Sequence, residues 1–195
     1  MLKRYLIFLG LIPAVVLIGL FWVRGMDPAL ARENGPLENI QLGFSLLSSL
    51  VFALQLRRME PRFRGILWGG FFFGLVCAVR EVDLRPLAHV PHWLELLGDG
   101  IGRDIVIGLL CIGFLFFVAQ SVYRLKWAVL RVGSTWFGLF LIAAAVAILL
   151  GDVYEKKLLG GESAQLCEEF MEAVGYFLLV CSALSARSLR AVAGP

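Results

Sequence analysis

The stretch Ile105–Val122 reads IVIGLLCIGFLFFVAQSV and contains no charged residue. A helix needs roughly 20 apolar residues to cross the hydrocarbon core of a bilayer, so this stretch is close to one full crossing. Its apolar residues follow one another without alternating with polar ones, which argues against a strand of a membrane β-barrel. We therefore interpret the stretch as a transmembrane helix.

Similar apolar runs occur along the whole chain. Of the 195 residues, 59% are hydrophobic, whereas an ordinary soluble domain has ~45–50% apolar residues. Backbone polar groups in lipid must find their partners inside the protein, which favours a bundle of helices. The sequence predicts an all-α integral membrane protein that forms a single domain over residues 1–195. Six transmembrane helices are expected at residues 5–23, 37–56, 65–80, 104–122, 132–151 and 163–186.

The basic residues predict how the chain is oriented in the membrane. The connector at residues 57–64 reads RRMEPRFR and the connector at residues 123–126 reads YRLK, with Glu60 as their only acidic residue. Lys and Arg are enriched in the cytoplasmic loops of membrane proteins, so these connectors are expected in the cytoplasm. This orientation places the N-terminus and the C-terminus in the cytoplasm as well. The expected location is the bacterial inner membrane.

The acidic residues gather on the opposite side. In this topology, all of the fifteen acidic residues except Glu60 lie at the outer side. Acids at helix N-termini are explained by the helix dipole, which favours them by ~0.3–1 kcal/mol each. Glu81 and Asp152 follow the C-terminal ends of helices, where the dipole disfavours a carboxylate. Glu172 is expected more than two turns into the last helix, where an ionisable side chain usually faces the bundle interior.

The spacing of the last acids predicts a polar cluster. Glu168 and Glu169 precede Glu172 by four and three residues, so each shares a helix face with it. Stacked carboxylates repel one another unless a proton, an arginine or a metal lies between them, and Arg80 is the expected partner. We predict one cluster just inside the outer leaflet, made of Glu38, Gln41, Arg80, Glu81, Asp83, Asp152, Glu169 and Glu172.

One interpretation of the cluster is the site of a membrane-embedded enzyme that acts on a lipid or a lipid-linked substrate. Asp152 and Glu172 would then be the catalytic pair, serving as general acid and base. Arg80, Glu38 and Gln41 would bind the substrate, with the guanidinium holding an anionic headgroup.

The cluster could also hold a divalent cation. Glu81, Asp83 and Glu169 are the expected metal ligands, and such oxygen-rich sites suit Mg²⁺, Ca²⁺ or Mn²⁺ better than Zn²⁺. His89 and His92 are weaker candidates, because their spacing is interrupted by a proline and a pair of histidines alone does not define a zinc site.

The alternative is a non-enzymatic protein: a subunit, chaperone or regulator of a larger membrane complex. The cluster would then be an ion-pair lock that fixes how the helices pack. A transporter is less favoured, because the polar residues gather at one face instead of near the midplane. Nucleic-acid binding is not expected, since the basic residues are short anchors beside membrane spans.

Overall fold

The computed structural model describes residues 35–82, 100–156 and 164–193, together with the single residues Gly19, Trp22 and Gly25. Within these ranges the chain is helical almost throughout and contains no strand. The long helices are α2 (Pro36–Leu56), α3 (Arg64–Glu81), α5 (Gly100–Leu125), α7 (Trp136–Glu155) and α8 (Ala164–Leu184). The short helical elements are η2 (Pro61–Phe63), α6 (Ala128–Gly133) and η3 (Ser185–Ala193).

Five helical segments of the described chain are long and apolar enough to cross a membrane. They are Pro36–Leu56, Pro61–Glu81, Gly100–Leu125, Trp136–Glu155 and Ala164–Val192. The most apolar of them, α5, leaves large side chains such as Leu109, Leu115 and Phe116 exposed. A surface of this kind indicates a lipid environment. The prediction of an all-helical membrane protein is confirmed, and the first predicted helix, residues 5–23, lies outside the described residues apart from Gly19 and Trp22.

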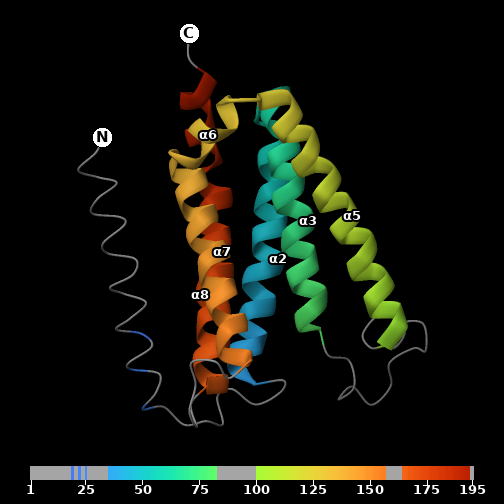
Figure 1. Ribbon diagram of the computed structural model, residues 1–195, viewed down its shortest axis with the longest axis vertical. Helices are drawn as coiled ribbons and strands as arrows, with labels where there is room; N and C mark the ends of the chain where they lie inside the picture. The colour runs from blue at the N-terminus through green and yellow to red at the C-terminus, as the bar shows by residue number, and fades with distance from the viewer. Residues whose placement is uncertain are drawn as a thin grey trace.

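The helices pack in a row. Helix α5 contacts α3, α3 contacts α2, α2 contacts α8, and α8 contacts α7. Helix α5 leans away from the others toward the lower end of the molecule in Figure 1, so that it touches only one neighbour along much of its length. The central helices α2 and α8 therefore hold two outer groups together, α3 with α5 on one side and α7 on the other.

The two ends of the bundle differ in charge. The α2–α3 connector, the α5–α6 connector and η3 all lie at the upper end in Figure 1. There the Arg190 guanidinium donates a hydrogen bond to the carbonyl oxygen of Arg58 at 2.9 Å, which links η3 to the α2–α3 connector. The basic residues of this end are Arg57, Arg58, Arg62, Arg64, Arg124, Lys126, Arg131, Arg187 and Arg190. The N-termini of α2 and α8 and the C-termini of α3 and α7 all lie at the lower end in Figure 1.

The predicted helix at residues 132–151 differs from the observed one at both ends. Helix α6 ends at Gly133 and α7 begins at Trp136, because Thr135 has an extended backbone and caps α7. The Thr135 hydroxyl accepts a hydrogen bond from the Gly138 N–H at 3.1 Å, as an N-cap side chain does. Helix α7 then continues to Glu155, so Asp152 lies in its last turn and not in the following loop.

Helices α5 and α3 also extend beyond their apolar runs. Helix α5 spans Gly100–Leu125 where residues 104–122 were expected, and α3 spans Arg64–Glu81 where residues 65–80 were expected. Helix α8 begins at Ala164, close to the expected start, and gives way to η3 at Ser185. Polar residues at the ends of membrane helices can keep their charged groups in water while the backbone stays helical, so apolar runs underestimate helix length.

Glycines let the helices approach closely. A Cβ atom added to Gly175 of α8 would lie 2.6 Å from Cγ1 of Ile148 and 3.2 Å from the carbonyl oxygen of Ala144, both in α7. Between α3 and α2, Gly74 lies directly against the hydroxyl groups of Ser48 and Ser49. Small residues at such contacts allow membrane helices to pack with their backbones close together.

Candidate functional site

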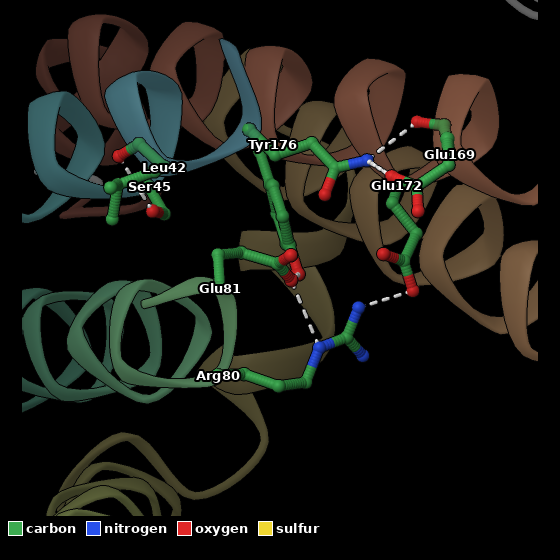
Figure 2. Close-up of polar contacts among 8 residues, drawn as sticks. Leu42, Ser45, Arg80, Glu81, Glu169, Glu172 and Tyr176 are labelled. Atoms are coloured by element: carbon green, nitrogen blue, oxygen red, sulfur yellow. Dashed lines mark hydrogen bonds and ion pairs between the residues drawn. The ribbon is translucent and has the colours of Figure 1, made fainter. Parts of the chain in front are cut away.

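Arg80 is the centre of the polar cluster at the lower end of the bundle. It lies in the last turn of α3, where a cation interacts favourably with the helix dipole. Its Nε donates to Oε1 of Glu81 at 3.0 Å, and its Nη2 forms an ion pair with Oε1 of Glu172 on α8 (Figure 2). The side chains of Glu81 and Glu172 are only 8% and 6% exposed, whereas that of Arg80 is 42% exposed. The guanidinium therefore reaches from the surface toward two buried carboxylates.

Tyr176 provides a second link between α3 and α8. Its hydroxyl donates a hydrogen bond to Oε1 of Glu81 at 2.9 Å, and the tyrosine itself is fully buried. Glu81 thus accepts hydrogen bonds from Arg80 on its own helix and from Tyr176 on α8 (Figure 2). Because α2 lies between α3 and α8 in the row, these polar contacts join two helices that are not packing neighbours along most of their length.

Gln41 ties α2 to α8 in the same cluster. Its Nε2 donates to the backbone carbonyl oxygen of Glu169 at 2.8 Å and to the carboxylate Oε2 of Glu169 at 2.6 Å. Both partners are acceptors, so the amide can only be oriented with its nitrogen toward Glu169. The amide oxygen is left over. Gln41 is fully buried, and its Oε1 has no hydrogen-bond donor among the residues that the structure describes.

Helix α7 makes room for Glu172 and adds another acid. A Cβ atom at Gly151 would lie 2.9 Å from Cγ of Glu172, so the absence of a side chain there lets Glu172 pass along α7 toward Arg80. The next residue, Asp152, is half-buried and repels the Glu172 carboxylate, as Glu81 also does. Asp152 forms no ion pair with any residue in the described part of the chain.

The cluster has more negative than positive charge. Three helices contribute carboxylates that repel one another, namely Glu81, Asp152, Glu169 and Glu172. Among the residues described, Arg80 is the only cation that forms ion pairs with them. Charges interact strongly where water is scarce, and carboxylates that share a site favour an additional proton or cation.

Most of the residues predicted for the cluster are close together in the structure. Arg80, Glu81 and Glu172 form one connected group, Gln41 and Glu169 form a second, and repulsion among the carboxylates couples the two groups. Of the other members, Asp152 acts on Glu172, and Glu38 acts on Glu169. Asp83, His89 and His92 lie outside the described residues.

Tyr176 was missed by sequence reasoning. A signal for it exists, because Tyr176 follows Glu172 by four residues and therefore shares its helix face. A buried tyrosine usually finds a hydrogen-bond partner for its hydroxyl.

No metal centre is formed by the described ranges. In residues 35–82, 100–156 and 164–193, no three His, Cys, Asp or Glu side chains are grouped so that they could hold a metal ion. Glu81 is bonded to Arg80 and Tyr176, and Glu169 to Gln41. A metal held by Glu81, Asp83 and Glu169 stays a prediction.

A cleft with apolar walls lies between the polar cluster and the basic end of the bundle. Its volume is about 370 Å³, and carbon atoms line it almost completely. Its lining includes Phe73 of α3, Phe114 of α5, Ala145 of α7, Phe52 of α2 and Leu179 of α8, and it extends to α6. The cleft therefore lies where the α3–α5 pair and α7 stand apart on the two sides of the central helices.

The cleft and the cluster share the same faces of three helices. Arg80 follows Phe73 by seven residues on α3, and Asp152 follows Ala145 by seven on α7. On α8, which runs in the direction opposite to α7, Glu172 precedes Leu179 by seven. Seven residues are two helical turns, so the members of each pair lie on one face about 10 Å apart along the helix axis. One face of the bundle thus passes from an apolar cleft to a charged end.

Comparison of the chain with models of protein families, with curated protein sequences and with solved structures gives no match.

Proposed function

We propose that this membrane protein binds a lipid or another amphiphile from the bilayer, with the headgroup at the polar cluster and the hydrocarbon chain in the apolar cleft. The shared seven-residue spacing on α3, α7 and α8 carries this proposal, because it orders a charged and an apolar region along one face. A volume of about 370 Å³ is within the range of small-molecule sites, roughly 300–1,000 Å³.

The distance from the cluster to the cleft matches the length of one acyl chain. The hydrocarbon core is ~30 Å thick, so one acyl chain extends over roughly half of it, ~15 Å. On α3, the cleft extends from Phe73 to Ile66. These residues are about 10 and about 21 Å from Arg80 along the axis, at 1.5 Å per residue. A chain whose headgroup is held near Arg80 would therefore end inside the cleft.

The charge distribution supports a cluster that opens to the outer leaflet. The basic end of the bundle carries the two connectors and η3 (Figure 1). Positively charged loops favour the cytoplasmic side, which leaves the cluster at the periplasmic side of the inner membrane. With six spans, both termini are then cytoplasmic.

If the site catalyses a reaction, Asp152 is the carboxylate best placed to act as the general base. The predicted catalytic pair is Asp152 and Glu172, but Glu172 is already engaged by Arg80. Asp152 has no ion pair with a described residue and lies beside Glu172, so its carboxylate is the one available as a general base.

The contact between Arg80 and Glu172 favours a second candidate. It joins α3 to α8 across α2, as expected of an ion-pair lock in a non-enzymatic subunit or regulator of a membrane complex. In that case the cluster holds the helices in place. A side chain of a partner subunit, or a lipid at the interface with it, fills the cleft. The two candidates differ in whether cleft and cluster bind one molecule.

Filling the cleft tests the amphiphile proposal. Ala145→Trp places an indole in the cleft and is expected to reduce the lipid that co-purifies with the protein by roughly tenfold, the equivalent of ~1.4 kcal/mol. Mass spectrometry of lipid extracted from the detergent-purified protein measures this. Val146→Trp is the control, because Val146 is 51% exposed and does not line the cleft. Equal retention in both variants and the wild type would contradict the proposal.

A further inference from the structure

We infer that the headgroup recognised by the polar cluster is a primary ammonium group. This inference rests on the proposed binding of an amphiphile and names the chemical class of its head. The cluster combines an excess of carboxylates with a fully buried hydrogen-bond acceptor that has no donor among the described residues.

Arg80 is poorly placed to bind an anionic head. Its Nε is bonded to Glu81 and its Nη2 to Glu172, so its charge is shared between two carboxylates. A phosphate brought to this point would also be repelled by Asp152 and Glu169, whose charges act on the Glu172 carboxylate that Arg80 binds. Arg80 was expected from the sequence to bind an anionic headgroup. Under the present inference it serves instead as an internal counterion.

The orphan oxygen of Gln41 specifies a donor. Its amide nitrogen is committed to two acceptors of Glu169, and no described residue donates to Oε1, so this oxygen is left for a donor from another molecule or group. Ionised carboxylates cannot donate, and the Tyr176 hydroxyl of the same cluster already donates to Glu81. The ligand therefore needs both an N–H or O–H donor and a positive charge.

A primary ammonium group meets both needs. It carries one positive charge and three N–H donors, enough for Gln41 Oε1 and for carboxylate oxygens beside it. A quaternary ammonium has the charge and no donor.

Three probes that share one chain test the inference on the full-length protein in an uncharged detergent. They are dodecylammonium, dodecanol and dodecyl phosphate, present at equal mole fraction in the micelles, and native mass spectrometry counts the bound molecules. We expect dodecylammonium to bind at least about tenfold more tightly than dodecanol, as one charge-assisted hydrogen-bonded contact provides. Dodecyl phosphate is expected to bind most weakly.

Variants of the cluster identify the residues that give the preference for dodecylammonium over dodecanol. Gln41→Leu and Glu169→Gln should each reduce the preference for dodecylammonium over dodecanol by about tenfold. Dodecanol binding in the same variants reports that the cleft is still folded. The matched control is Glu60→Gln, which removes the acid of an exposed pair with Arg62 at the basic end and should leave the preference unchanged.

Competition with ethylammonium shows whether the site recognises an amphiphile or a soluble amine. It has the head without the chain, and each buried CH₂ adds ~0.8 kcal/mol, so it should displace dodecylammonium only at a concentration ~100-fold higher or more. Displacement at an equal concentration would overturn the inference in favour of a soluble amine.

The remaining outcomes distinguish the two proposals. If none of the three dodecyl probes binds, the proposed amphiphile function fails together with the inference. If all three bind alike, or if dodecyl phosphate binds best, the amphiphile function stands and the ammonium inference is overturned.

Discussion

Arg80→Met is expected to lower the free energy of unfolding by about 3 kcal/mol, because removing one partner of a buried ion pair leaves the other charge uncompensated. Arg80 shares its charge between Glu81 and Glu172, both of which are nearly inaccessible to solvent. Its own side chain is partly exposed, which places the expected loss at the lower end of the range for buried pairs. Thermal or denaturant unfolding in detergent, followed by circular dichroism, measures the loss.

A double-mutant cycle identifies the partner. Arg80→Met combined with Glu172→Gln should cost less than the sum of the single changes, by about 1–3 kcal/mol, because the buried carboxylate is no longer left unpaired. The control cycle uses Arg62→Met and Glu60→Gln, whose side chains are both 45% exposed. An exposed pair contributes less than ~1 kcal/mol. Additive losses at Arg80 and Glu172 would contradict the geometry of the cluster.

Gly175→Ala is expected to destabilise the protein by about 1–3 kcal/mol, the usual cost of an overpacked contact. The added methyl group would lie 3.2 Å from the Ala144 carbonyl oxygen and 3.3 Å from the Ile148 nitrogen, so helix α7 would have to move away from α8. Because Gly151 and Asp152 lie on the same helix as these atoms, the displacement would also disturb the contact with Glu172. The same unfolding measurement in detergent applies.

Gly108→Ala is the matched control for this change. A Cβ atom at Gly108 of α5 meets nothing within 4 Å. Alanine is favoured over glycine in a helix by up to ~1 kcal/mol, so this variant should be neutral or more stable. If the two alanine variants changed stability in the same direction, the close packing of α7 on α8 would be refuted.

The polar end of the bundle could be predicted from the sequence because charges in a membrane are costly. Glu172 lies too deep in the last helix to be a surface acid, and Arg80 lies in the last turn of α3 at the same end, so electrostatics favours their pairing. The helical fold follows in the same way from backbone hydrogen bonding in lipid. Both arguments depend on the large free-energy cost of placing a charge or an unpaired backbone group in lipid, which few other contacts can offset.

The apolar cleft and the helix ends could not be predicted in this way. Residues that face lipid and residues that face other helices are equally apolar, so composition does not show that α5 leans away from α7. The break before α7 depends on one capping side chain, Thr135, inside a region that otherwise continues the apolar pattern. Gln41 was expected to be near the cluster, but its unpaired oxygen is visible only once both acceptors on Glu169 are located.

Photolabelling tests most directly whether the cluster and the cleft bind one molecule. The reagent is a dodecylammonium with a diazirine at the end of its chain, applied to the full-length protein in detergent, and the labelled residues are mapped by mass spectrometry. Binding across both regions predicts labelling at Phe73, Phe114 and Ala145 that is strongly reduced by Glu169→Gln. Labelling mainly at the exposed side chains of Leu109 and Leu115, unchanged by that substitution, would mean that the chain contacts the protein only as bulk lipid does.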